Sequence, residues 1–258
     1  MAEAGTAHST STTPSAGAPG GTASGETASS GLAPDLRDRM ALALDVDDLV
    51  EANRLARQLR PWFGVAKIGL ELFTAAGPDA INAMLDLGYD VFLDLKLHDI
   101  PTTVRKSAGV AGALGVTYLT MHASGGPAML RAGVEGFLES AHRAGMPTPT
   151  ALGITVLTSD ADAPAHIVPN RLRIAVEAGC GGVVCAASDL IDVRQMAPRT
   201  MRVVPGIRAA GAERHDQPKA VTPAIALAEG ADLLVIGRAV TLADDPAAAA
   251  ASLFGELG

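Results

Sequence analysis

Residues 91–101 read VFLDLKLHDIP, an apolar run in which Asp94 and Lys96 lie two residues apart. A strand that is apolar at nearly every position is typical of a parallel sheet covered on both faces. Residues two apart in a strand point to the same side, so this carboxylate and this ammonium share one space. Neither charge is stable in a protein interior without a partner or a ligand. The spacing alone fits a structural salt bridge as well as a catalytic pair, but the nearby charges Lys67 and Asp99 favour a functional site.

The sequence around this stretch predicts eight β-α units. From residue 40 onward, short apolar runs alternate with longer segments of helical periodicity, such as 48–60. Thr222 followed by Pro223 is typical of a helix N-cap, and Gly230 suits the end of that helix. An open doubly wound sheet has the same alternation, but eight units favour a closed (β/α)8 TIM barrel of the α/β class. The expected strands are Met40–Asp45, Phe63–Gly69, Asp90–Leu95, Val116–Met121, Thr150–Thr155, Gly181–Cys185, Arg202–Pro205 and Asp232–Ile236.

The composition changes near residue 34. Residues 1–34 are rich in Ser, Thr, Gly, Ala and Pro, contain no Lys or Arg, and show no apolar periodicity, so we predict a disordered tail. This segment lacks the basic start and apolar middle of a secretory signal, and also the arginines of a transit peptide. The remaining residues 35–258 are expected to form one barrel domain, which typically needs about 250 residues.

Charge and composition exclude several classes of protein. The formal net charge is −8 and no long basic run occurs, which argues against a nucleic-acid partner. No apolar run reaches the roughly 18 residues of a membrane-spanning helix. Cys180 and Cys185 lack the further Cys or His residues of a zinc site, so we expect two reduced thiols in a core. These features predict a cytoplasmic protein with a small-molecule ligand.

Polar residues interrupt the apolar runs at nearly every predicted strand end. Asp45 closes the first strand, Lys67 lies in the second, and Asp94 and Lys96 lie at the end of the third, with Asp99 shortly after. In barrels of this kind, active residues gather at the carboxyl ends of the strands. We therefore expect these charges to form one site.

At this point the chain resembles a known family, the orotidine 5′-phosphate decarboxylases. DLKLHDIP at 94–101 closely matches that family's signature, and the resemblance covers nearly all of residues 38–257. Each further motif is weak alone, but the ordered series is specific. The other matching motifs are ALD at 43–45, KIG at 67–69, VLTS at 156–159, PGIR at 205–208 and VIGR at 235–238.

The resemblance implies conversion of orotidine 5′-monophosphate to uridine 5′-monophosphate without a metal or an organic cofactor. It implies an alternating charge network of Lys67, Asp94, Lys96 and Asp99, in which Lys96 protonates carbon six of the pyrimidine. Asp94 is expected near the departing carboxylate. Asp99 is expected to reach the neighbouring subunit's site, together with Thr103, so the resemblance implies a homodimer.

The other motifs are implied to bind the nucleotide. Without the resemblance, Thr158 and Ser159 fit an ordinary turn after the fifth strand. Lys219 and Ala209 differ from the residues that the family often has there, which bears on loop closure. His98 is expected to be structural or solvent-facing, whereas His122 could line the base pocket or pack. The implied contacts are Asp45 and Lys67 with ribose, Thr103 with the neighbour's ribose, Thr158 and Ser159 with the pyrimidine, Gly237 and Arg238 with phosphate, and Gln217 in a closing loop, 207–221, that begins after Pro205.

Two other functions remain open at this stage. Metal-dependent sugar-phosphate decarboxylases and aldolases share the barrel and a D-x-K-x-x-D pattern. Lys67 argues against them, because a cation beside the carboxylates opposes binding of magnesium. A non-catalytic barrel that only binds a ligand predicts damage within the four charged residues, and none is visible.

Overall fold

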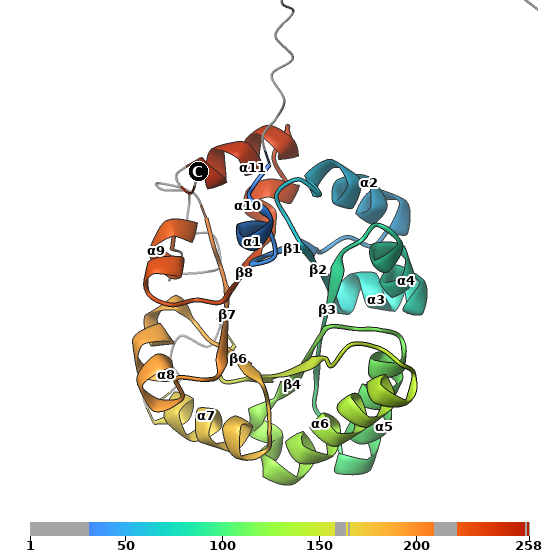
Figure 1. Cartoon of the computed structure of the whole chain (residues 1–258), viewed down its shortest axis with the longest axis vertical. Coiled ribbons are helices and arrows are strands. Elements are labelled where there is room, and N and C mark those ends of the chain that lie inside the picture. Colours follow the sequence, from blue (N-terminus) through green and yellow to red (C-terminus); the bar gives the residue numbers. More distant parts are fainter. Residues whose placement is uncertain (1–30, 158–163, 165, 209–220, 256, 258) are drawn as a thin grey trace, which may run out of the picture.

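Eight parallel strands close into one barrel in which each strand pairs with its neighbours in the sequence and β8 pairs with β1 (Figure 1). The computed structural model describes residues 31–157, 164, 166–208, 221–255 and 257. The predicted (β/α)8 TIM barrel is confirmed, and every expected strand overlaps an observed one. The strands are β1 Met40–Leu44, β2 Val65–Gly69, β3 Asp90–Leu97, β4 Tyr118–His122, β5 Thr150–Ile154, β6 Gly182–Val184, β7 Met201–Pro205 and β8 Leu233–Ile236.

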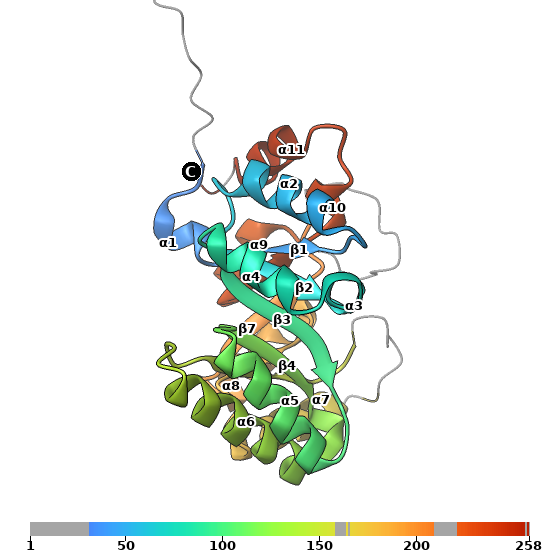
Figure 2. The same ribbon diagram turned by 90° about the vertical axis from the view of Figure 1, so that its right-hand side faces the viewer.

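Most of the helices form a ring outside these strands, while α1 (Pro34–Arg37) lies at one end of the barrel (Figures 1 and 2). The expected cap is confirmed, because Thr222 Oγ1 accepts a hydrogen bond from the amide of Ile225 and Gly230 follows the helix end with φ +102°. None of the helices in the described ranges is both long and apolar enough to cross a membrane. The helices are α1 Pro34–Arg37, α2 Leu49–Leu59, α3 Leu70–Ala76, α4 Pro78–Asp86, α5 Pro101–Ala113, α6 Gly126–Arg143, α7 Ile167–Glu177, α8 Leu190–Met196, α9 Pro223–Ala228, α10 Arg238–Thr241 and α11 Pro246–Phe254, with 3-10 turns η1 Ala123–Gly125 and η2 Ala187–Asp189.

Leu32, three residues before the expected domain boundary at 35, contacts the barrel. Leu32 donates its amide to the carbonyl oxygen of Pro61 at 3.1 Å and packs on the core. At the other end, α11 lies beside α2 (Figures 1 and 2), and the ring of Phe254 packs edge-on against that of Phe63 with centroids 5.5 Å apart. The two ends of the described chain thus both contribute to the core.

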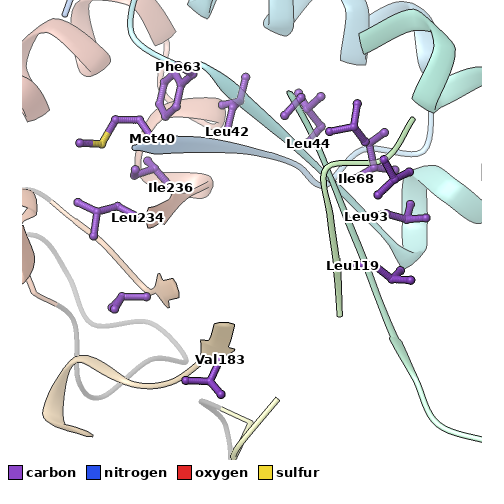
Figure 3. Packing of buried hydrophobic residues seen from close by; sticks show 14 of the residues in the cluster. Met40, Leu42, Leu44, Phe63, Ile68, Leu93, Leu119, Val183, Leu234 and Ile236 are labelled. Atoms are coloured by element: carbon purple, nitrogen blue, oxygen red, sulfur yellow. The ribbon is translucent and has the colours of Figure 1, made fainter. Parts of the chain in front are cut away.

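The strands separate two apolar layers, which explains why they are apolar on both faces. Residues such as Leu42 and Leu93 pack outward beneath the helices (Figure 3), while a smaller cluster fills the barrel interior. Side chains alternate between these layers along each strand, as the two-residue period of a strand requires. The inner cluster consists of Ala41, Ala43, Val65, Phe92, Leu152, Val203, Leu233 and Val235.

Both cysteines are buried and free, as expected from their spacing. Burial raises the pKa of each thiol, Cys180 and Cys185, to about 12. Both thiols are therefore protonated and weakly nucleophilic at neutral pH. Their contribution is to packing.

Helices α5 and α6 approach each other closely through glycine. A Cβ atom added to Gly136 would overlap the backbone carbonyl of Arg105, and one added to Gly112 would overlap the carbonyl oxygen of Phe137. In both cases the obstacle is backbone, which cannot rotate away. Because α5 directly follows the segment that contains Asp99, this contact helps to position that segment.

We predict that Gly136→Ala destabilises the fold. In an open helix interior alanine is more stable than glycine by about 1 kcal/mol, but overlap with Arg105 should reverse the sign and give a net loss of about 1–3 kcal/mol. Urea unfolding measures this free energy. In the matched variant Gly109→Ala, the nearest atom to the new Cβ is Ser140 Oγ at 2.9 Å, which can rotate, so its loss should be smaller. A Gly136→Ala variant as stable as wild type would contradict this packing.

Candidate active site

The polar site is built where the inward-facing side of the strands reaches the barrel rim. Asp45, Lys67 and Asp94 each follow an inward-facing apolar residue of β1, β2 or β3 by two positions. The β2–β3 register pairs Gly69 with Asp94. The two-residue alternation therefore places three charged side chains directly above the apolar interior.

These charges form a connected chain of ion pairs. Lys67 Nζ lies 2.7 Å from Asp45 Oδ1 and 3.9 Å from Asp94 Oδ2. Lys96 Nζ lies 2.8 Å from the same Asp94 Oδ2. Lys67 is only 7 % exposed, so removing its carboxylate partners would leave a buried, unpaired ammonium. The side chain of Lys96 is 33 % exposed and remains accessible.

The backbone that carries this pair departs from the regular strand that the sequence predicted. The β3–β4 register pairs Leu93 with Leu119 and then Leu97 with Met121, so three residues of β3 face one residue of β4. Within this bulge Lys96 has φ +51°, and it is the only non-glycine residue in the described ranges with positive φ. A left-handed backbone costs a non-glycine residue roughly 1–2 kcal/mol. Asp94 and Lys96 meet as expected, but through a bulge rather than through strand alternation.

Thr120 is the residue of β4 that faces the bulge. Its hydroxyl accepts a hydrogen bond from the backbone amide of Lys96 at 2.9 Å and donates one to Asp94 Oδ1 at 3.0 Å. Thr120 is fully buried. Sequence reasoning missed it. The available signal was a threonine between Leu119 and Met121, in the strand that follows the one carrying Asp94 and Lys96.

The charges line a cavity of about 220 Å³ at the carboxyl ends of the strands. Asp45, Lys67, Asp94 and Lys96 form its charged wall. Apolar residues from β3, β5, β6 and β8, and from the segment directly after β5, form much of the remainder. These include Phe92, Ile154, Val156, Leu157, Val184 and Val235. The cavity therefore offers an apolar surface for a flat ring beside a cluster of charges.

The cavity is also lined by the expected phosphate-binding residues. Pro205, Gly237 and Arg238 all line it, as does Arg208, for which sequence reasoning gave no role although it lies within the PGIR motif. A Cβ on Gly237 would lie 3.2 Å from Ala43 Cβ, so the β8 end approaches β1 closely. Two arginines, Arg208 and Arg238, thus line the same cavity as the carboxylates Asp45 and Asp94.

Asp99 and Thr103 do not join this cluster within the single chain. Both are exposed near the start of α5, and neither lines the cavity. Asp99 Oδ1 accepts a hydrogen bond from the amide of Ile100 at 2.6 Å. Of the four charged residues expected in the network, Lys67, Asp94 and Lys96 therefore lie together and Asp99 lies apart. Thr158, Ser159 and Gln217 lie outside the described residues.

Two histidines lie beside the charged cluster without lining the cavity. The rings of His98 and His122 have centroids 5.5 Å apart and are tilted by 42°. His98 is exposed and His122 is half-buried. Burial lowers the pKa of His122, and the positive charges of His98, Lys96 and Arg171 lower it further, while Asp94 opposes them.

The donor set of the cavity does not suit a metal ion. Over residues 31–157, 164, 166–208, 221–255 and 257, no three His, Cys, Asp or Glu side chains are arranged to hold one. Asp45 and Asp94 are both paired with ammonium groups. A hard cation would have to displace these partners.

Comparison with known proteins supports the resemblance seen in the sequence. The model of the "Orotidine 5'-phosphate decarboxylase / HUMPS family" matches residues 38–253. The chain belongs to this family. The match spans all eight strands and includes the charged cluster on β1, β2 and β3.

Individual members of the family agree with this assignment. Orotidine 5'-phosphate decarboxylase of Moorella thermoacetica is 42% identical over 233 residues, which are 86% of this chain and 92% of that protein. The protein of the same name from Anaeromyxobacter sp. (strain K) is 45% identical over 227 residues, 84% of this chain and 96% of that protein. The crystal structure of orotidine 5'-phosphate decarboxylase from Lactobacillus acidophilus is 33% identical with a TM-score of 0.72, covering 86% of this chain and 99% of that one.

We predict that protonation of His122 opposes folding of this family member. Its pKa is lower in the folded than in the unfolded chain, so the unfolded state takes up a proton first as the pH falls below the ordinary value of 6.5. The free energy of unfolding should therefore fall between pH 7.5 and pH 5.5, and more steeply in wild type than in His122→Gln. Urea unfolding across this range measures both slopes. Parallel stability curves for wild type and His122→Gln would contradict a lowered pKa of His122 in the folded chain.

Proposed function

We propose that the chain decarboxylates orotidine 5′-monophosphate to uridine 5′-monophosphate, the last step of de novo pyrimidine nucleotide synthesis. The observation that carries the proposal is the Lys96 ammonium, 2.8 Å from Asp94 and exposed toward a cavity with an apolar wall. Family membership and relatives that are orotidine 5'-phosphate decarboxylases support the same substrate. The two buried free thiols suit a reducing compartment, and we place the enzyme in the cytoplasm.

Lys96 is the group that handles the reacting carbon. The bond between carbon six and the carboxylate breaks, carbon dioxide leaves, and the electron pair stays on carbon six. The ammonium stabilises this negative charge and donates a proton to carbon six. The neutral amine then regains a proton from solvent. This step needs no cofactor.

Asp94 lies close to the substrate carboxylate, but its repulsion is too small to account for catalysis. Two like charges about 4 Å apart repel by about 4 kcal/mol at an effective dielectric of 20, whereas enzymes lower barriers by roughly 8–23 kcal/mol. The larger share comes from Lys96, whose position is fixed before the charge develops. Binding energy from the phosphate contributes by ordering the substrate.

The rest of the cavity binds the nucleotide. Asp45 and Lys67, 2.7 Å apart, contact the ribose hydroxyls. Gly237 and Arg238 contact the phosphate, with Pro205 beside them, since a guanidinium matches phosphate oxygens in geometry and charge. On the family resemblance we also assign Thr158 and Ser159 to the pyrimidine edge and Gln217 to ligand binding, and all three lie outside the described residues.

A homodimer completes the site in this proposal. Asp99 and Thr103 enter the cavity of the neighbouring subunit, where Asp99 adds a second carboxylate to Lys96. Ile100 lies between them and is 66% exposed, and Val110 further along α5 is 60% exposed. A subunit contact over this segment would cover both apolar side chains.

The sugar-phosphate decarboxylases and aldolases remain the rival enzyme class, because they share the barrel and the D-x-K-x-x-D pattern found here at residues 94–99. Their use of a metal conflicts with the carboxylates here, both of which are paired with ammonium groups. Magnesium-dependent turnover of a sugar phosphate would favour that class. Nucleotide binding without any turnover would favour a non-catalytic barrel.

We predict that Lys96→Ala abolishes decarboxylation and largely retains uridine 5′-monophosphate binding. The substitution removes the proton donor but leaves the ribose and phosphate contacts in place. Loss of orotidine 5′-monophosphate absorbance measures turnover, and calorimetric titration measures product affinity. Turnover close to the wild-type value in this variant would refute the role of Lys96.

We predict that two inactive variants restore activity when mixed. Lys96→Ala keeps a functional Asp99, and Asp99→Asn keeps a functional Lys96, so each mixed dimer contains one complete site. Random exchange of subunits in an equimolar mixture should give about a quarter of the wild-type activity per subunit. Unfolding and refolding the two variants together permits exchange, with variants refolded separately as the control. A mixture as inactive as its components would contradict a shared site.

A further inference from the structure

We infer that Thr120 is a positioning residue that holds Asp94 and Lys96 in their reactive arrangement through one hydroxyl group. The inference extends the proposed function, on which its activity measurements rest. Thr120 does not line the cavity and is fully buried, so it acts through its two partners and not on the substrate.

The backbone bulge creates the need for such a residue. Between the pairs Leu93–Leu119 and Leu97–Met121, the backbone of β3 leaves the regular ladder. The amide of Lys96 therefore loses its usual strand partner, and a buried amide without a partner is costly. The Thr120 hydroxyl accepts from this amide at 2.9 Å and so replaces the missing backbone carbonyl.

The same hydroxyl also fixes the orientation of Asp94. It donates to Oδ1 at 3.0 Å, which leaves Oδ2 facing Lys96 Nζ at 2.8 Å and Lys67 Nζ at 3.9 Å. A hydroxyl has one proton to donate and lone pairs to accept with, so both roles are satisfied together. The carboxylate cannot turn away from the ammonium groups without breaking this bond.

These two bonds counteract a local strain. Lys96 adopts φ +51°, a left-handed backbone that is unfavourable for a residue with a side chain. Without the bond to Thr120, the Lys96 backbone is free to relax and its ammonium to move. Displacements of about 1 Å at a reacting group can lower a rate on the order of 100-fold.

The test compares four variants. Thr120→Val removes the hydroxyl and should lower kcat about 10- to 100-fold, with KM for orotidine 5′-monophosphate close to wild type. Thr120→Ser keeps the hydroxyl and should retain most of the turnover. If the valine variant does not fold, Thr120→Cys can be compared with Thr120→Ser instead. A thiol is a weak hydrogen-bond donor and acceptor. Thr120→Cys should therefore turn over more slowly than Thr120→Ser.

Thr155→Val is the matched control. Thr155 is also fully buried at a strand end, donates its hydroxyl proton to the carbonyl oxygen of Val184 at 2.9 Å, and does not line the cavity. Its loss should lower stability but leave kcat near wild type. Equal losses of kcat in the two valine variants, or equal turnover of Thr120→Ser and Thr120→Cys, would overturn the inference.

Hydrogen exchange at the Lys96 amide gives a readout that needs no activity. This amide should be protected in wild type and in Thr120→Ser, and should exchange faster in Thr120→Val or Thr120→Cys. Unchanged protection on loss of the hydroxyl would overturn the positioning role even in an active enzyme. Absence of wild-type decarboxylation would refute the proposed function, and the exchange rates would still decide the role of Thr120.

Discussion

Attraction between the Asp94 carboxylate and two ammonium groups is the interaction on which the rest of the site depends. At the rim of an apolar barrel these charges are poorly solvated, so each requires the others. The ammonium of Lys67 is almost wholly buried and is neutralised by the carboxylates of Asp45 and Asp94. The ammonium of Lys96 also pairs with Asp94, but its side chain stays accessible to a ligand. One constraint thus fixes the cluster and leaves one ammonium available for chemistry.

The barrel provides the rigidity that this arrangement needs. Each charged side chain of the cluster lies within, or directly after, a strand packed between two apolar layers, so its backbone has little freedom to move. The exception is the bulge of β3, where Lys96 lies in a left-handed conformation. Strained residues in well-packed surroundings often occur at functional sites. Here the strain coincides with the proposed proton donor, and a buried hydroxyl from the next strand supports it.

Much of this structure follows from the order of residues along the chain. Eight apolar runs separated by helical segments predicted the barrel, and charges at successive strand ends predicted that Asp45, Lys67, Asp94 and Lys96 share a site. Two-residue alternation assumes a regular strand, however, and cannot foresee the bulge that turns Lys96. Thr120 was missed for the same reason, because its role depends on an irregular register between neighbouring strands. The contact of Leu32 with Pro61 could not be predicted from the composition of the segment, because composition gives an average polarity and does not identify single contacts. Asp99 lies outside the cavity of its own chain. Its proposed role is therefore in the cavity of the neighbouring subunit.

The central claim is that an ammonium held by carboxylates suffices for decarboxylation without a metal. It is tested most directly by following the absorbance of orotidine 5′-monophosphate with enzyme and buffer stripped of metals by a chelator. The account predicts full turnover, unchanged when magnesium is added back. Turnover that disappears with the chelator and returns with magnesium would contradict it.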